Sequence, residues 1–291
     1  MGKCRSNAVL RGKEGAEART GDMAELAKSV LEGIVAMRRR RMEEARAHLP
    51  LGQLEEAAEA RAERRDFAGA LSGGSLRVIA ELKRASPSRG LLCRDYRPRH
   101  LAEAYAAAGA AALSVLTEED FFLGSLGDLR EVRGAVGLPV LRKDFILDGY
   151  QVFESVAAGA DALLLIVAAL TDTDLRNLLE LCGRQRIAAL VEVHTAEEVD
   201  RALAAGARII GINNRNLNSM QVSLETSFRL RAKIPSTCLA VSESGIKKAA
   251  DLERLARAGF NAVLMGERLM TAPDPGRELA ALLEGAKGRA H

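Results

Sequence analysis

Short apolar runs alternate with amphipathic stretches through residues 78–266, and this alternation limits the possible folds more than any other feature. Consecutive runs are separated by enough chain for one helix. Short strands that alternate with helices are typical of βαβ units and of a parallel sheet. We expect strands at 78–83, 112–116, 139–144, 162–167, 188–193, 209–214, 239–244 and 262–266.

An internal repeat favours a closed barrel over an open sheet. The stretches AAGAAALSVL, AAGADALLLIV, AAGARIIGI and ARAGFNAVLMG each place a glycine just before a strand. Glycine is favoured just past the end of a helix, so the repeated unit is helix, glycine, strand. An open doubly wound sheet usually carries G-x-G-x-x-G after its first strand, and that motif is missing. The sequence therefore predicts an α/β protein with a (β/α)8 TIM barrel.

The chain before the first strand is predicted to be helical. Apolar residues recur at helical spacing through 23–47, and 49–67 reads as a second helix opened by Pro50. We expect a disordered leader at 1–22, and a single barrel domain over 23–291 with the helices of 23–66 as an N-terminal extension. The basic stretch Met37–Arg41 lies in the helical pattern, which favours a solvated helix face over a nucleic-acid patch.

Composition excludes several other classes of protein. The net charge of +3 is too small to indicate a nucleic-acid partner. No apolar run reaches the roughly 18 residues of a membrane span, and no signal-peptide core follows Met1. The four cysteines are far apart, which suggests neither a zinc site nor a disulfide framework. We expect a cytoplasmic protein with no nucleic-acid or membrane partner.

Polar side chains gather at the carboxyl ends of the predicted strands. Because side chains alternate along a strand, Glu81 and Lys83 share a face, as do Glu192 and His194. Barrel enzymes place their active sites at this end. The alternative is that these residues only form structural ion pairs at the end of the barrel. Because five strands end in polar side chains, we favour a site that binds an anionic substrate and transfers protons. The other polar tips are Lys143, Asn213, Arg215 and Glu243.

Two glycines indicate a phosphate site. SESGIKK and MGERLM place Gly245 and Gly266 after the seventh and eighth strands, where helices are expected to begin. Backbone N–H groups at a helix N-terminus bind phosphate, and barrels often hold phosphate after these two strands. The alternative is that the glycines only permit tight turns.

With these residues identified, the sequence resembles the indole-3-glycerol-phosphate synthase family. The matching stretches come in the family's order over residues 24–273, and the leading helices resemble the family's extension over the barrel mouth. The resemblance implies a carbon–carbon lyase of tryptophan biosynthesis. It would close the indole ring of 1-(2-carboxyphenylamino)-1-deoxyribulose 5-phosphate with loss of CO2 and water. The stretches are IAELKRASPSRG, LTEEDFFLGSL, LPVLRKDFILDGYQVFESVAAGADALLLIVAAL, LVEVHTAEE, IGINNRNL, VSESGI and VLMGERLM.

The resemblance also implies roles for individual residues. Lys143 matches the general acid, and Glu192 matches a second proton-transfer group. Glu81 matches a residue that orients and shares in that step, and Lys83 matches a catalytic lysine that holds substrate and takes part in proton transfer. Polar contacts to the anthranilate end match Ser86, Asn213 and Arg215, and apolar contacts to its ring match Phe122 and Phe145. The residues that match the base of the family's substrate pocket and its phosphate-binding site are Glu243, Ser244, Gly245, Leu264 and Gly266. No metal or organic cofactor is implied, and other tryptophan-pathway enzymes are candidate partners.

Two other functions fit less well. Phosphoribosylanthranilate isomerase usually uses a Cys and an Asp as its acid–base pair, and the first strand has no Cys. A non-catalytic phosphosugar-binding protein would lack Lys143 or Glu192, and both are present. Glu267 follows Gly266, so we expect backbone N–H groups rather than this carboxylate to meet phosphate. The resemblance gives His194 no role.

Overall fold

The computed structural model describes residues 31–216 and 220–287, so the expected leader at 1–22 lies outside the described chain. Parallel strands close into a barrel in the order β1-β10-β9-β8-β7-β6-β5-β4, which confirms the predicted (β/α)8 fold. Each expected strand agrees with the observed one to within one residue at either end. The barrel strands are β1 (Arg77–Leu82), β4 (Ala112–Leu116), β5 (Val140–Lys143), β6 (Ala162–Ile166), β7 (Ala188–Val193), β8 (Ile209–Asn213), β9 (Leu239–Glu243) and β10 (Ala262–Met265).

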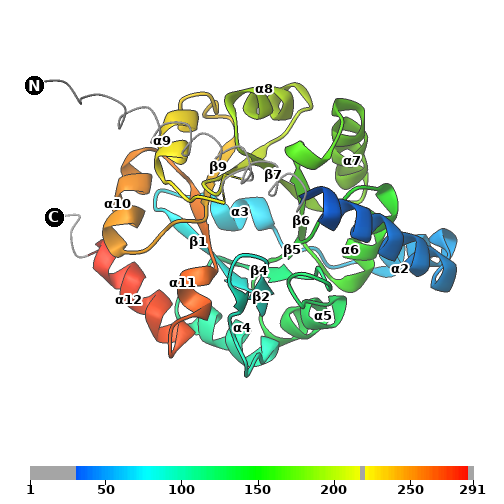
Figure 1. Cartoon of the computed structure of the whole chain (residues 1–291), viewed down its shortest axis with the longest axis horizontal. Coiled ribbons are helices and arrows are strands. Elements are labelled where there is room, and N and C mark those ends of the chain that lie inside the picture. The colour runs from blue at the N-terminus through cyan, green and yellow to red at the C-terminus, as the bar shows by residue number, and fades with distance from the viewer. Residues whose placement is uncertain (1–30, 217–219, 288–291) are drawn as a thin grey trace, which may run out of the picture.

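Helices surround the barrel (Figure 1). Several begin at a side-chain cap: the oxygens of Ser125, Asp148, Thr171 and Thr195 accept backbone N–H groups of the first turn. The described helices are α2 (Leu51–Ala60), α3 (Phe67–Leu71), α4 (Pro98–Ala107), α5 (Leu126–Ala135), α6 (Gly149–Ala158), α7 (Asp172–Arg184), α8 (Ala196–Ala204), α9 (Glu225–Arg231), α10 (Ala249–Arg257), α11 (Glu267–Met270) and α12 (Pro275–Lys287), with the 3-10 helix η1 (Val167–Ala169) and a helix over residues 31–48.

The repeated glycine of the sequence has a conformational cause. The glycines of the four repeats all adopt positive φ, between 80° and 104°, directly after a helix. Residues with a Cβ rarely adopt this conformation, so glycine ends each helix and turns the chain toward the next strand. The glycines are Gly109, Gly159, Gly206 and Gly259.

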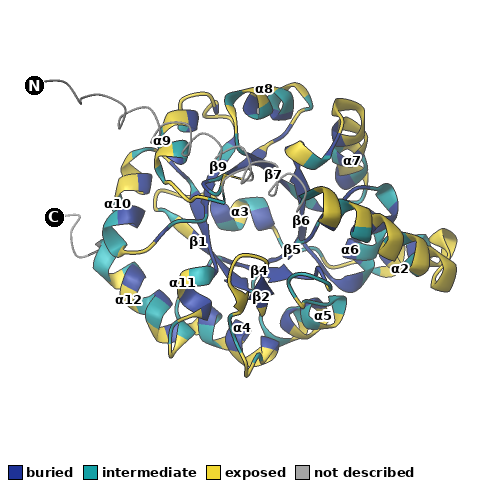
Figure 2. Cartoon of the chain, in the orientation of Figure 1, coloured by how far each residue is buried: buried dark blue, intermediate teal, exposed yellow. Residues whose placement is uncertain are grey.

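The described residues form two apolar cores. One lies between the strands and the surrounding helices, and the other fills the barrel interior. Figure 2 shows the strands buried while the outer faces of the helices are exposed. Phe67 and Leu71 of α3 join the interior core together with Ala112, Ala162 and Ala262, which stand at strand starts. Helix α3 therefore closes the amino end of the barrel, and the carboxyl end is left for polar groups.

The predicted helix over 49–67 is wrong as a single element. Helix α2 ends at Ala60, residues 61–66 are not helical, and α3 begins at Phe67. Arg61 forms an ion pair of 2.7 Å with Asp161, and the Arg65 guanidinium donates to the carbonyl oxygens of Val136 and Leu138. These bonds to the barrel replace the helical bonds that local propensity favours.

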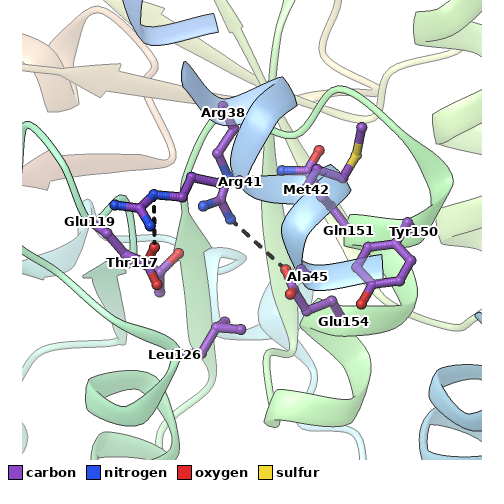
Figure 3. Close-up of a pocket in the computed structure, with 10 residues that line it drawn as sticks. All are labelled: Arg38, Arg41, Met42, Ala45, Thr117, Glu119, Leu126, Tyr150, Gln151 and Glu154. Atoms are coloured by element: carbon purple, nitrogen blue, oxygen red, sulfur yellow. Dashed lines mark ion pairs between the residues drawn. The ribbon is translucent and has the colours of Figure 1, made fainter. Parts of the chain in front are cut away.

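The helix over residues 31–48 packs on the barrel through arginines. Arg38 Nη2 lies 2.9 Å from Asp144 and Arg41 Nη2 lies 2.7 Å from Asp120. Arg39, Arg40 and Arg41 are exposed, as expected of a solvated helix face, whereas Arg38 is buried against the barrel. A cavity of about 60 Å³ lies between this helix and the barrel. Figure 3 shows Arg38 and Arg41 among the residues that line it. None of the described helices is long and apolar enough to span a bilayer.

The loop after β1 contains a small hairpin that was not predicted. Its strands β2 (Ala85–Ser86) and β3 (Gly90–Leu91) pair antiparallel. Gly90 at φ 66° lies on the return strand. The hairpin holds Ser86 in a buried position close to the barrel mouth.

Candidate active site

Strand register brings the predicted charged side chains to one level of the barrel. Glu192 on β7 aligns with Gly211 on β8, and Asn213 on β8 aligns with Glu243 on β9. Each of these side chains stands near the carboxyl end of its strand, beyond the apolar interior core. The predicted ring of polar tips is therefore present in the structure.

Lys143 lies between two carboxylates from other strands. Its Nζ donates to Glu192 Oε2 at 2.9 Å and lies 3.3 Å from Glu243 Oε2. The other oxygen of Glu192, Oε1, accepts a hydrogen bond of 3.1 Å from Asn213 Nδ2. Both carboxylates are buried, so water screens these charges little. The lysine and the two glutamates form one electrostatic unit.

Glu81 and Lys83 form a second ion pair in the same mouth. Lys83 Nζ donates to Glu81 Oε1 at 2.6 Å. The Glu81 charge also raises the pKa of Lys143, so the two groups of charges act on one another. The two opposite charges at the end of β1 thus pair together and also belong to the larger site.

Burial and charge act in opposite directions on this cluster. Burial lowers the pKa of Lys143, but the surrounding carboxylates raise it by more, so the ammonium keeps its proton. Burial raises the pKa of Glu192, and attraction to Lys143 and to the nearby His194 imidazole outweighs it, so this carboxylate stays ionised. Burial raises the pKa of Glu243 to about 7 despite its contact with Lys143. Glu243 therefore binds a proton more readily than an ordinary carboxyl group.

Two glycines give these carboxylates room. A Cβ at Gly211 would collide with Glu243 Oε1, and a Cβ at Gly266 would collide with Glu81 Oε1. Gly211 was not among the predicted site residues. A glycine inside an apolar strand often marks a close approach of another group, and that signal could have identified it.

The predicted aromatic contacts come together from two loops. The ring centroids of Phe122 and Phe145 are 6.4 Å apart and both rings are half-buried. Ser86 Oγ is buried and has no hydrogen-bond partner within the described part of the chain. A buried hydroxyl without a partner is costly, so this group is suited to bind a ligand.

Arg215 and Glu267 form an ion pair that was not predicted. Arg215 Nη2 lies 3.1 Å from Glu267 Oε2, and Arg89 Nη2 lies 2.9 Å from the other oxygen. The Glu267 carboxylate therefore joins the loop after β1 to the loop after β8. Its charge is balanced by two guanidinium groups, which agrees with its exclusion from the phosphate site.

The predicted phosphate cradle is only partly as expected. Gly266 precedes α11 directly, but α10 begins at Ala249, four residues after Gly245. Ser244 and Gly245 both have positive φ, 67° and 83°, and a Cβ at Gly245 would lie 2.7 Å from Val222. The glycine thus allows a turn against the loop after β8 instead of opening a helix. Leu264 is buried in the interior core beneath this turn.

Two comparisons of sequence agree on the family that this chain resembles. A family model described as indole-3-glycerol phosphate synthase matches residues 31–282. The indole-3-glycerol phosphate synthase of Polaromonas naphthalenivorans (strain CJ2) is 47% identical over 257 residues, which cover 87% of this chain and 98% of that protein. The synthase of Chlorobium chlorochromatii (strain CaD3) is 52% identical over 208 residues, covering 70% and 81%.

Solved structures resemble the fold at low identity. The 3-hexulose-6-phosphate synthase of Salmonella typhimurium has a TM-score of 0.58 at 12% identity, with 73% of this chain and 99% of that chain covered. Thiamine phosphate pyrophosphorylase from Pyrococcus furiosus has a TM-score of 0.57 at 14% identity, covering 74% and 98%. These likenesses concern the barrel architecture alone.

Proposed function

The chain belongs to the indole-3-glycerol phosphate synthase family, and from this membership we propose which of its side chains perform the reaction. The protein is a carboxy-lyase of tryptophan biosynthesis. Its substrate, 1-(2-carboxyphenylamino)-1-deoxyribulose 5-phosphate, loses CO2 and water as the indole ring closes. The reaction needs an acid at the ketone oxygen, a second proton-transfer group for loss of water, and a pocket for two anionic ends.

Lys143 is the proposed acid for ring closure. An ammonium has three N–H groups, and two carboxylates lie within 3.3 Å of this one. A further N–H can reach a substrate ketone oxygen and stabilise the negative charge that develops there. Because burial removes competing water, the interaction is stronger than in solution.

Glu192 is the proposed group for loss of water, and Glu81 supports it. Asn213 and Lys143 bond opposite oxygens of Glu192 and so fix the plane of its carboxylate. Glu81 stands across the mouth with Lys83, which is placed to hold the substrate. Orientation of this kind is required because a proton moves only over hydrogen-bond distance.

The remaining predicted residues are proposed to bind the two ends of the substrate. Phe122 and Phe145 flank the aromatic ring, and Ser86 and Arg215 meet its polar groups. The phosphate end is assigned to Ser244, Gly245 and Gly266, with Glu243 and Leu264 as the floor. The half-buried ring pair and the buried, unpartnered Ser86 hydroxyl support this orientation.

A cytoplasmic location is also proposed. Biosynthesis of an amino acid uses cytoplasmic metabolites, and the described cysteines Cys93, Cys182 and Cys238 are free thiols, as expected in a reducing compartment. Other tryptophan-pathway enzymes remain candidate partners.

The position of the half-buried Lys143 between Glu192 and Glu243 is the observation that supports the proposed mechanism. We expect Lys143→Met to lower kcat by about 100-fold or more, while binding of the substrate phosphate end is retained. The measurement is the rise of indole fluorescence on addition of substrate, with a separate titration of binding. The chain contains no Trp, so its own emission is low.

Lys233→Met is the matched control. Lys233 is an exposed lysine paired with Asp200 at 2.8 Å on the outer surface, and its removal should leave kcat unchanged. Full turnover by Lys143→Met, with the control also active, would show that another group is the acid.

A further inference from the structure

The reaction consumes one proton that the substrate does not supply. The ketone oxygen takes two protons on its way to water, and the sugar methylene beside nitrogen returns one. The carboxylate leaves as CO2 and carries no proton away. One proton per turnover must therefore be held by the protein or enter from solvent. While substrate covers the mouth, a group inside the site is needed to hold it.

His194 lies beside Glu192 in a position suited to hold this proton. Its Nδ1 forms a hydrogen bond of 3.1 Å with Glu198 Oε2. Its Nε2 is buried 3.3 Å from Glu192 Oε1, a charge contact in which Nε2 has no hydrogen-bond partner within the described chain. The backbone N–H of His194 donates to the same Glu198 oxygen at 2.6 Å, which fixes the ring between the two carboxylates. The side chains of Glu192, His194 and Glu198 are 4%, 8% and 15% exposed, so exposure increases away from the catalytic carboxylate.

His194 and Lys143 approach different oxygens of Glu192. Lys143 bonds Oε2, whereas the imidazole faces Oε1, which Asn213 from β8 also contacts. A proton can therefore pass from His194 to Glu192 without displacing the lysine. Glu192 on β7 and Glu198 on α8 are the charged groups that contact the imidazole.

The two carboxylates keep the imidazole charged. Burial alone would lower the pKa of His194, but the nearby carboxylates of Glu192 and Glu198 raise it to about 9. The ring therefore carries a proton at both nitrogens near neutral pH. Glu198 has a separate function in this arrangement, because it directs Nδ1–H away from the site and leaves Nε2–H for Glu192.

We propose that His194, held by Glu198, stores the proton that each turnover consumes and passes it to Glu192. Glu192 is ionised at rest, so it first takes the Nε2 proton of His194: the Nε2–H bond breaks and an O–H bond forms on Glu192. The carboxyl group then gives this proton to the departing hydroxyl and is ionised again, while the proton lost from the sugar methylene returns to Lys143, which protonated the ketone oxygen. The imidazole is left neutral with its Nδ1–H still directed at Glu198, and Nε2 takes a proton from solvent after product leaves. His194 acts through Glu192, so it is a positioning and proton-supplying residue. The inference rests on the proposed role of Glu192.

Three substitutions test this function. His194→Gln keeps an N–H donor for Glu192 but stores no proton, so kcat should fall at least about tenfold with KM unchanged. Glu198→Gln removes the charge that holds the imidazole proton, so the fall of kcat at alkaline pH should begin about one pH unit lower. Glu197→Gln changes the exposed neighbour on the same turn and should leave both kcat and its pH profile unchanged.

The readout is kcat from indole fluorescence between pH 6 and 10, with thermal unfolding to verify that each variant is folded. A structural role alone would lower the melting temperature without moving the pH profile. The inference would be overturned if His194→Gln and Glu198→Gln both kept the wild-type kcat and pH profile. If Glu192→Gln were inactive in the same assay, the proposed role of Glu192 would still stand. An active Glu192→Gln would overturn both. If His194→Gln fails to fold, the pH profile of Glu198→Gln decides.

Discussion

At the scale of single residues, the site depends on what two positions lack. Gly211 and Gly266 carry no side chain, and the carboxylates of Glu243 and Glu81 occupy the space that a Cβ would need. The charged groups can approach one another only because these glycines stand beside them. The absence of a methyl group is therefore as specific a requirement as the presence of a lysine.

We expect Gly211→Ala to lower both activity and stability. The new Cβ would force the Glu243 carboxylate away from Lys143, and crowding in a packed core costs about 1 to 3 kcal/mol. Indole formation and urea unfolding measure the two effects.

Gly134→Ala is the control for this substitution. Gly134 is exposed in α5 and nothing lies within 4 Å of its Cβ position. The Gly134→Ala variant should keep full activity, and its free energy of unfolding should rise by up to about 1 kcal/mol. Equal activity and equal unfolding midpoints for Gly211→Ala and the wild type would show that the strand relaxes without moving Glu243.

The charged site residues could be predicted because alternation along a strand fixes which side chains share a face. Glu81, Lys143 and Glu192 follow from that rule together with the barrel topology. Pairing between strands could not be predicted in the same way. Which carboxylate bonds Lys143, and that Glu267 is neutralised by two arginines, depends on register and loop geometry that local sequence does not encode.

At the scale of elements, the helix over residues 31–48 supports the strand that carries Lys143. Asp144 follows Lys143 and accepts hydrogen bonds from Arg38 of that helix at 2.9 Å and from Arg142 at 3.0 Å. Arg142 is fully buried and also pairs with Glu154 of α6 at 2.8 Å. The N-terminal helix, β5 and α6 are thus joined by one ion-pair network directly behind the proposed acid.

We expect Arg38→Met to destabilise the protein by about 1 to 3 kcal/mol, because the buried Asp144 loses one of its charged donors. The value of kcat should fall as well, since the end of β5 is less firmly held. Urea unfolding and indole formation are the measurements.

Arg39→Met serves as the comparison, since Arg39 is the exposed neighbour and its loss should change stability by less than about 0.5 kcal/mol. If the two variants unfold at the same urea concentration, the helix is held mainly by its apolar contacts.

Helices and strands were predicted well where local sequence determines their bounds. They were predicted poorly where contacts with distant residues determine them. The helix–glycine–strand repeat follows from backbone preference, and all eight strands were placed correctly. The break between α2 and α3 was missed because Arg61 and Arg65 bond residues 71 to 100 positions away. The start of α10 at Ala249 was missed because the turn at Ser244 and Gly245 packs on Val222 of another loop.

At the scale of the whole molecule, buried ionisable groups make stability depend on pH. A group whose pKa is raised by folding binds its proton more tightly in the folded state, so the free energy of unfolding falls as pH rises between its two pKa values. For His194 this interval runs from 6.5 to about 9, and for Glu243 from 4.5 to about 7. Above pH 7, the effect of His194 should dominate.

We expect the wild type to lose stability relative to His194→Gln as the pH rises from 7 to 9. At about 1.4 kcal/mol per pH unit, the difference is at most about 3 kcal/mol. Urea unfolding of both proteins at four or five pH values would measure it. Parallel curves would mean that the imidazole is neutral in the folded protein throughout this range.

The pairing of β1 with β10 has a consequence for how the enzyme is made. Glu81 stands on the first strand of the ring and Gly266, which leaves space for its carboxylate, directly follows the last. During synthesis Ala262–Met265 leaves the ribosome roughly 10 to 40 s after Arg77–Leu82, at ordinary rates of translation. Until then the nascent chain contains Lys143 and the site carboxylates, but no closed barrel holds them at one level. Catalytic competence is therefore expected only once β10 has been made, and a chain truncated before β10 should be inactive.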